Sequence, residues 1–306
     1  MIQAPGVTFP CQSSFTTILS MQVLDHPAEL RARLTASLSA GARVGFVPTM
    51  GALHAGHLAL VEASRAQTDL TVMSIYINPA QFAAGEDFSR YPRDFDRDLS
   101  LAADAGVDIL FKPDDEVMYP SGTDAQQVWV DPGALGDKLE GAHRPGHFRG
   151  VATVVAKLFN MVRPEAAFFG QKDAQQSIVI RRLVRDLALP VQIEVVPTVR
   201  EDDGLALSSR NVYLSPEQRK EAPAIFRGLQ AAGQAFDAGE RRPRAIVDEV
   251  KAELGRGAPS ASVEYVALTD YETLDPYPET VDTPALLSLA VRFGSTRLID
   301  NIPLLP

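Results

Sequence analysis

Short apolar segments alternate with amphipathic ones over the first two-thirds of this chain, and this alternation limits the possible folds more than any other feature. The apolar segments are rich in β-branched and aromatic residues and lie at 43–49, 70–78, 107–113, 166–170 and 191–199. Segments with helical character lie before or between them, at 26–41, 56–67, 92–106, 151–162 and 173–189. Such apolar runs are typical of parallel strands buried on both faces. The alternation therefore predicts an α/β fold with a doubly wound parallel sheet.

The pattern changes after about residue 200. Two amphipathic helices are expected at 214–240 and 242–257, followed by three strands of an antiparallel or mixed sheet at 262–270, 285–294 and 296–302. A chain of 306 residues is long enough for two domains. We expect an extension at 1–20 that is disordered, a Rossmann-like ligand-binding domain at 21–198, and a small α+β lid domain at 199–306.

Composition excludes several classes of function. The net charge of −10 disfavours non-specific binding to nucleic acid or to anionic membranes. No apolar run approaches the roughly 18 residues of a membrane span, and residues 1–20 lack the basic and apolar regions of a signal peptide. Met21 is an alternative start, and Cys11, the single cysteine, lies in the extension. We expect a cytoplasmic enzyme without an intramolecular disulfide, a nucleic-acid partner or a membrane partner.

Two histidines, His54 and His57, lie where the strand at 43–49 is followed by the helix at 56–67. Ligands of doubly wound sheets bind beyond the carboxyl ends of the strands. A helix N-terminus there favours an anion, and Gly51 and Gly56 would let the backbone approach it closely. Two imidazoles three positions apart share one helix face, and near a polyphosphate their pKa values should rise. This pattern predicts a phosphate site.

Other interpretations of these histidines are weaker. Gly51 and Gly56 have the spacing of a P-loop, but His57 and Leu58 occupy the positions where that motif has Lys and Ser or Thr. No GxGxxG motif occurs either. Two unrelated polar residues in a loop remain an alternative, as does a metal-binding pair, although no third ligand lies nearby in sequence.

Polar residues also follow the other expected strands. Gln81 follows the segment at 70–78, and its amide suits a hydroxy-acid ligand. Lys172 supplies positive charge for phosphate after 166–170, and Gln176 lies one helical turn further on. Asp173 has the position of an N-cap, which is an alternative to ligand binding. Two serines and an arginine at 208–210 form a suitable phosphate clamp.

Several of these segments resemble known protein families. His-x-Gly-His after a first strand resembles the signature of the nucleotidyl-transfer superfamily, which includes class I aminoacyl-tRNA synthetases and small adenylyltransferases. The phrase PTMGALHAGHLALVEAS is more similar to the pantothenate synthetase family, ligases that join pantoate to β-alanine. Six further segments resemble the same family: SIYINPAQF, YPRDFDRDL, KLEGAHRPGHFRGVATVVAKLFN, FFGQKDAQQ, VPTVREDDGLALSSRNVYL and GSTRLIDNI. The resemblance runs from about residue 21 to the C-terminus.

The resemblance implies roles for individual residues. It assigns His57, His54, Lys172 and Arg210 to catalysis, and Gln81 and Gln176 to pantoate and β-alanine. It implies an ATP site whose residues are Met50, Gly51, Ala52, Leu53, His54, Ala55, Gly56, His57, Gly170, Gln171, Lys172, Asp173, Val199, Leu207, Ser208, Ser209 and Arg210. Gln171 stands where the family usually has glutamate. A homodimer is also expected from the family.

The acidic segment at 91–99 offers Asp94, Asp96 and Asp98 for Mg²⁺, although a solvated helix face would explain them equally well. The resemblance points to Asp98, with Arg97 beside it. The segment at 141–150, with His143 and His147, is expected to be a mobile loop near the site without a catalytic role.

We therefore expect a two-step ligase that uses ATP and Mg²⁺. Pantoate would attack the α-phosphorus to give pantoyl adenylate, and β-alanine would then displace AMP. Two alternatives remain open. One is a nucleotidyltransferase acting on a phosphorylated substrate, and the other is a non-catalytic nucleotide-binding protein.

Overall fold

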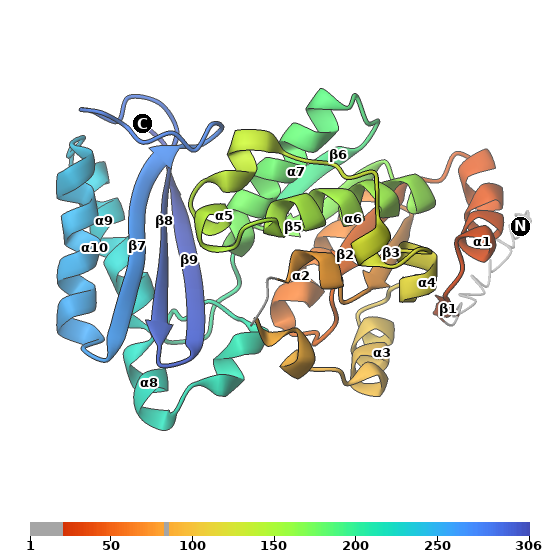
Figure 1. Ribbon diagram of the computed structural model, residues 1–306, viewed down its shortest axis with the longest axis horizontal. Coiled ribbons are helices and arrows are strands. Elements are labelled where there is room, and N and C mark those ends of the chain that lie inside the picture. The colour runs from red at the N-terminus through yellow and green to blue at the C-terminus, as the bar shows by residue number, and fades with distance from the viewer. Residues whose placement is uncertain (1–20, 83–85) are drawn as a thin grey trace, which may run out of the picture.

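The computed structural model describes residues 21–82 and 86–306 of the chain. The predictions for residues 1–20, including Cys11 and the proposed disorder, lie outside the described residues. Figure 1 shows two units side by side, an N-terminal one with a central sheet and a C-terminal one with a smaller sheet. In the described part of the chain, every helix is too short or too polar to cross a lipid bilayer.

The sheet of the N-terminal unit has six strands in the order β1-β4-β3-β2-β5-β6, and all its pairings are parallel. The prediction of a doubly wound parallel sheet is confirmed. Its strands are β1 (Gln22–Leu24), β2 (Val44–Thr49), β3 (Leu70–Ile75), β4 (Ile109–Phe111), β5 (Ala166–Gly170) and β6 (Gln192–Val196). Strand β1 was not predicted, because its three residues are too few to show a period.

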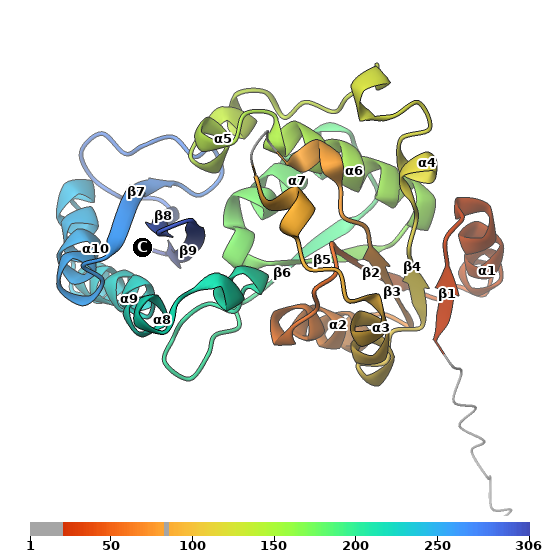
Figure 2. The same ribbon diagram turned by 60° about the horizontal axis from the view of Figure 1, so that its bottom comes forward.

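Helices cover both faces of this sheet (Figure 2). One face packs against α1 (Pro27–Ser39), α6 (His147–Val162) and α7 (Ala174–Asp186), and the other against α2 (Ala55–Gln67) and α3 (Phe95–Asp104). Phe46 and Phe111 lie in the first core, and Phe168 lies in the second. Nearly all of α6 is buried. A helix that lies between the sheet and other elements has to be apolar on most of its surface.

The segment expected to be a loop at 141–150 is largely helical, so that prediction is wrong. Two short helices precede α6, namely α4 (Asp115–Met118) and α5 (Glu140–His143), and α6 itself begins at His147. Gly146 connects α5 to α6 with a φ of 81°, a left-handed value that favours glycine. The sequence pattern Arg-Pro-Gly suggested a loop, but it spans only the tight connection between two helices.

The C-terminal unit has its own core. Strands β7 (Ala261–Asp270), β8 (Ala285–Phe293) and β9 (Thr296–Leu304) form an antiparallel sheet, which packs against α9 (Ala224–Asp237) and α10 (Pro243–Gly257). The predicted small α+β unit is confirmed. The single helix expected at 214–240 is in fact two helices, α8 (Pro216–Glu221) and α9. Pro223 lies between them and has no N–H to continue the hydrogen bonding of α8.

Candidate active site

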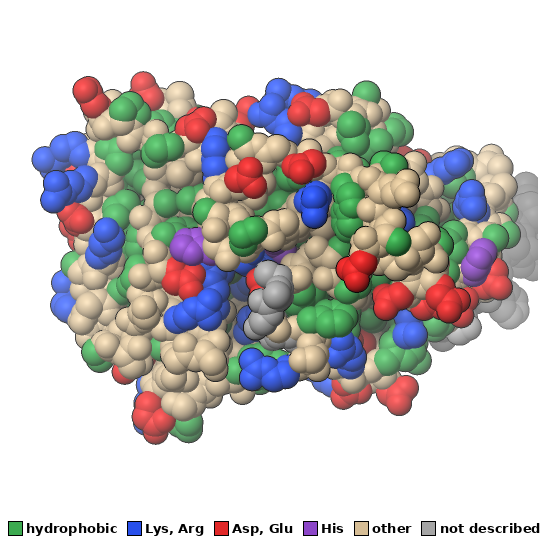
Figure 3. Space-filling model, in the orientation of Figure 1, with side chains coloured by type: hydrophobic (Ala, Val, Ile, Leu, Met, Phe, Trp, Pro, Cys, Tyr) green, Lys and Arg blue, Asp and Glu red, His purple; other side chains and the backbone are tan. Residues whose placement is uncertain are grey.

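A cavity of about 230 Å³ lies beyond the carboxyl ends of β2, β3, β5 and β6, as expected for ligands of this fold. Each strand contributes residues that follow it, among them Met50, Asn78, Lys172 and Thr198. The segment at 207–210 also lines the cavity. Figure 3 shows Lys and Arg side chains on this face near the junction of the two units, although the whole chain is acidic. Arg144, Lys172 and Arg210 line the cavity itself, which therefore suits an anionic ligand.

His54 and His57 are joined by hydrogen bonds at the start of α2. His54 is the N-cap, and its Nδ1 accepts the Gly56 N–H at 3.1 Å. The Nδ1 of His57 accepts the His54 N–H at 3.3 Å, which completes a reciprocal capping box. Both Nδ1 atoms are acceptors, so each neutral ring carries its proton on Nε2. Both rings line the cavity.

Both imidazoles are neutral in this structure. Burial, followed by the charge of Lys172, lowers the pKa of His54 to about 4. Burial and the neighbouring His54 lower the pKa of His57 to about 3. The expectation of charged imidazoles applies to a site with bound polyphosphate. Without one, each ring offers a neutral N–H donor.

Asp98 supports the loop between β2 and α2 and does not line the cavity. Its carboxylate oxygens accept the N–H groups of Ala52 at 2.8 Å and Leu53 at 2.7 Å, and its side chain is almost fully buried. Gly51 has a φ of 78°, and a Cβ there would lie 2.8 Å from Asp98 Oδ2. Gly51 thus leaves room for this carboxylate. Asp98 therefore holds the backbone that leads into α2. Its expected role as a magnesium ligand stays a prediction.

Gln81 lies in the short 3₁₀ helix Pro79–Gln81, lines the cavity and is 8% exposed. The backbone carbonyl oxygen of Gln81 lies 2.7 Å from Nδ1 of His147 and 3.3 Å from a guanidinium nitrogen of Arg144. Burial and the charge of Arg144 lower the pKa of His147 to about 4. Arg144 and His147 were expected to have no catalytic role, because their segment was expected to be a loop. Both line the cavity.

A group of charged residues lies opposite the histidines. Lys172 Nζ lies 3.7 Å from Asp173 Oδ1. Burial raises the pKa of Asp173, but Lys172 and Arg210 outweigh this effect and hold it below its usual range. Asp173 makes no side-chain cap hydrogen bond to α7, so the alternative N-cap role is not supported. Gln176 also lines the cavity.

Strand β9 holds two of the loops that form the cavity. Asn301 Nδ2 donates to the carbonyl oxygens of Gln171 and Lys172, both at 2.9 Å. Asp300 accepts two hydrogen bonds, at 2.6 and 3.0 Å, from Arg200 in the segment that leads to 207–210. The C-terminal unit therefore determines where Lys172 and the 207–210 segment lie.

Most of the predicted ATP-site residues line the cavity, and five do not. Those that do are Met50, His54, Gly56, His57, Gly170, Lys172, Asp173, Val199, Leu207, Ser208, Ser209 and Arg210. Those that do not are Gly51, Ala52, Leu53, Ala55 and Gln171. The side chain of Gln171 instead bonds to Asn301 at 2.8 Å and to Tyr271 at 3.2 Å. Its place in the contact between the units explains why it is not directed at the cavity.

Thr198 was not singled out from the sequence. It follows β6 and lines the cavity, and its buried Oγ1 has no hydrogen-bond partner among the residues that the structure describes. Buried hydroxyls are almost always paired, so this atom is available to a ligand. A single threonine after a strand carries no sequence signal that distinguishes a site residue from any other threonine.

A parallel sheet with a helix N-terminus and a histidine capping box at its carboxyl edge agrees with the site expected from the His-x-Gly-His signature. The family model described as pantoate-beta-alanine ligase matches residues 22–303. The pantothenate synthetase of Pelotomaculum thermopropionicum is 50% identical over 285 residues, covering 92% of this chain and 98% of the relative. Pantothenate synthetase 1 of Bradyrhizobium diazoefficiens is 52% identical over 284 residues, covering 93% and 98%.

Solved structures agree with these relatives. Pantothenate synthetase from Thermus thermophilus has a TM-score of 0.86 and 50% identity, covering 94% of this chain and all of the other. The Francisella tularensis pantoate-beta-alanine ligase, complexed with beta-gamma ATP and β-alanine, has a TM-score of 0.74 and 31% identity, covering 92% and 97%. The chain belongs to the pantoate–β-alanine ligase family and is a ligase.

Proposed function

We propose that this cavity condenses pantoate with β-alanine at the expense of ATP through a pantoyl-adenylate intermediate. The observation that carries the proposal is the histidine capping box at the start of α2, which presents two Nε2–H donors to an anion-binding cavity. Lys172 and Arg210 line the same cavity from other elements. A pocket with several fixed donors suits a reaction in which negative charge moves between phosphate oxygens.

In the first step a carboxylate oxygen of pantoate attacks the α-phosphorus of ATP. An O–P bond forms, the bond to the β-phosphate breaks, and pyrophosphate leaves with the electron pair. In the second step the neutral amine of β-alanine attacks the acyl carbon. The amide bond forms, AMP departs as the phosphate, and the amine loses a proton. Neither step requires a covalent bond to the protein.

The residues divide between the substrates by position. His54, His57, Lys172 and Arg210 would contact phosphate oxygens, since all four line the cavity. Val199 would face the adenine end, together with the Thr198 hydroxyl, which has no hydrogen-bond partner within the described part of the chain. Gln81 and Gln176 would hold pantoate. In this arrangement catalysis rests on orientation and on preformed donors.

Magnesium would have to be held mainly by the phosphates of ATP. Among the described residues no cluster of three His, Cys, Asp or Glu side chains could hold a metal ion. Asp173 is the carboxylate that lines the cavity, and it pairs with Lys172. One carboxylate together with phosphate oxygens fits the usual Mg²⁺ environment. The ion would neutralise charge on the phosphates, and Asp173 would be its protein contact.

Three further properties belong to this proposal. The chain would act in the cytoplasm and as a homodimer, as expected for its family. The 199–306 region would act as a lid, because its 207–210 segment and β9 border the cavity. Closure of that region would keep water away from the acyl adenylate.

Isotope exchange between pyrophosphate and ATP tests the proposed order. Exchange should depend on pantoate and proceed without β-alanine. His54→Ala should lower its rate roughly 10²–10³-fold because a transition-state donor is lost. His26→Ala is the matched control, since His26 also caps a helix through Nδ1 but lies on α1, away from the cavity.

Three outcomes would contradict the proposal. Exchange that needs β-alanine would exclude the adenylate order. A stable adenylated product from a phosphorylated substrate would indicate a nucleotidyltransferase. ATP binding without AMP release in the presence of pantoate and β-alanine would indicate a non-catalytic protein.

A further inference from the structure

A buried chain of hydrogen bonds leads from Tyr119 to Gln81. The Tyr119 hydroxyl lies 2.8 Å from Asn78 Oδ1, and Asn78 Nδ2 lies 3.2 Å from Gln81 Oε1. Tyr119 is 3% exposed, Asn78 1% and Gln81 8%. Gln81 and Asn78 line the cavity, but Tyr119 does not. Tyr119 can therefore affect a ligand only through its partners.

Backbone groups fix the direction of every bond in this chain. The Ala80 N–H, which can only donate, lies 3.2 Å from Asn78 Oδ1. The Gly150 carbonyl, which can only accept, lies 3.2 Å from Asn78 Nδ2. The orientation of the Asn78 amide is thus unambiguous. Tyr119 must donate to Asn78, and Asn78 must donate to the oxygen of Gln81.

The amide of Gln81 consequently has one orientation. Its Oε1 is occupied by Asn78, so its Nε2 is the end left for the cavity, where it lies 2.8 Å from Sδ of Met50. We propose that Tyr119 is a positioning residue: its hydrogen bond to Asn78 helps to hold that amide, and through it the Gln81 amide, in the orientation that makes Gln81 a donor to the hydroxy-acid substrate. This inference rests on the proposed function, since it assumes that pantoate binds at Gln81.

The surroundings of Tyr119 keep it in the donating form. Burial raises the pKa of Tyr119 to about 12, so its hydroxyl stays protonated at neutral pH. The Lys157 ammonium lies 4.8 Å from the centre of its ring, and the Trp129 ring lies 6.3 Å from it. These contacts restrict the ring, so the hydroxyl always meets the same acceptor.

Tyr119→Phe tests the proposal, because it removes the donor and keeps the ring. Pantoate-dependent exchange should lose roughly 3–10-fold in kcat/KM for pantoate, the range expected for one buried hydrogen bond. The KM for ATP should stay within about twofold of the parent's. Tyr277→Phe is the matched control, because its hydroxyl bonds to Thr283 in the other unit.

A double-mutant cycle with Gln81→Ala separates positioning from general structural support. If Tyr119 acts through Gln81, Tyr119→Phe should change the exchange rate less than about twofold once Gln81 is absent. If Tyr119→Phe lowers the exchange rate equally in the parent and in Gln81→Ala, the inference is overturned. A rise in the KM for ATP alone would also overturn it. If exchange by Gln81→Ala is too slow to measure, pantoate binding by calorimetry replaces it in the cycle.

Two measurements keep the outcomes distinct. Unchanged emission of Trp129, the single tryptophan, would show that the region around residue 119 is intact in the variant. A parent protein without pantoate-dependent exchange would refute the proposed function itself. A parent with exchange and a Tyr119→Phe variant indistinguishable from it would refute only the inference.

Discussion

His147 shows how strongly this cavity favours neutral imidazoles. It is 9% exposed, contacts Arg144 and the Gln81 carbonyl, and has a pKa of about 4, whereas an unfolded histidine has a pKa near 6.5. His54 and His57 show pKa shifts in the same direction. Protonating any of these rings in the folded state costs free energy, because the charge would be buried near other cations.

The free energy of unfolding should therefore fall as pH falls from about 6.5 towards 4, because only the unfolded chain takes up these protons. Above about pH 6.5 the contribution is complete. Urea unfolding at about pH 7.5 and pH 5.0 measures the loss, and His147→Gln should reduce it by about 1–2 kcal/mol. His143→Gln, which replaces an exposed histidine on α5, is the control. If the free energy of unfolding falls equally between these two pH values in the parent and in His147→Gln, the buried, neutral environment assigned to His147 is contradicted.

Among individual residues, the sequence predicted those whose role can be inferred from their neighbours in the chain. His54, His57, Lys172 and Arg210 stand out because each follows an expected strand or opens a helix. The contacts of Asp98 could not be predicted, because its partners, Ala52 and Leu53, are distant in sequence and offer only backbone N–H groups. A carboxylate that holds a loop and one that binds metal look the same in a sequence.

Helix α6 and the 3₁₀ helix Pro79–Gln81 are in close contact, and this contact places Gln81. Gly150 on α6 makes the approach possible, since a Cβ there would lie only 2.2 Å from the Ala80 carbonyl oxygen. The Gly150 carbonyl also accepts from Asn78. The same glycine thus allows close packing and contributes to the orientation of Asn78.

Gly150→Ala should displace the 3₁₀ helix, lower stability by roughly 1–3 kcal/mol and reduce pantoate-dependent exchange. Gly255→Ala is the matched control. It also lies in a helix, but a Cβ at that position would meet no atom within 4 Å. The control should be neutral or stabilising by about 0.5–1 kcal/mol. Melting temperatures and exchange rates measure both effects; normal exchange by Gly150→Ala would show that the contact does not position Gln81.

The elements that the sequence predicted are those long enough to show a period. The alternation of apolar strands and amphipathic helices was sufficient for the doubly wound sheet and for the C-terminal unit. The start of α6 was missed because Pro145 and Gly146 indicate a break, and a break between two helices resembles a loop. The contact of α6 with residues 79–81 had no signal at all, since it depends on tertiary packing.

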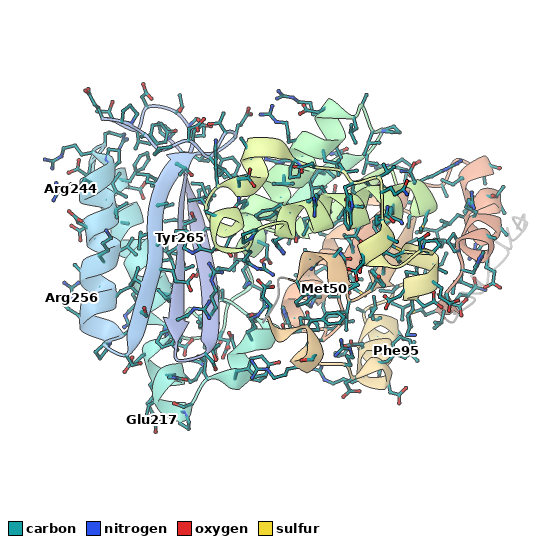
Figure 4. All side chains as sticks on the ribbon, viewed as in Figure 1. Met50, Phe95, Glu217, Arg244, Arg256 and Tyr265 are labelled. Carbon is teal, nitrogen blue, oxygen red and sulfur yellow. The ribbon has the colours of Figure 1, made fainter. Side chains whose placement is uncertain are left out.

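Over the whole molecule, a buried ion pair links the two units. Arg297 on β9 donates to both oxygens of Glu140 on α5, at 2.5 and 2.8 Å, and Tyr265 on β7 donates to the same carboxylate at 2.7 Å. Figure 4 labels Tyr265 on the C-terminal sheet and Met50 in the N-terminal unit, while Arg244 and Arg256 lie along α10, at the outer side of the molecule. Sequence patterns could not show this link, because its members are far apart along the chain.

Arg297→Met should leave Glu140 buried without its cation and destabilise the protein by roughly 3–5 kcal/mol. Because each unit has its own core, the two should then unfold separately. Trp129 fluorescence reports on the N-terminal unit and circular dichroism on both, so their urea midpoints should diverge in the variant and coincide in the parent. Adding Glu140→Gln should recover part of the loss. Coincident transitions in Arg297→Met would show that the units remain coupled by other contacts.

The order of strands in the sheet has a consequence for synthesis on the ribosome. Strand β1 is the first described strand to be made, yet its partner in the sheet is β4, and β2 and β3 lie on the far side of β4. A nascent chain cannot pair β1 until Ile109–Phe111 has left the exit tunnel, whereas β2 and β3 can pair earlier. An unpaired apolar strand edge is open to incorrect association during that interval. Slowing translation while Ile109–Phe111 is still inside the tunnel should therefore increase aggregation of the nascent chain more than slowing it after these residues have emerged.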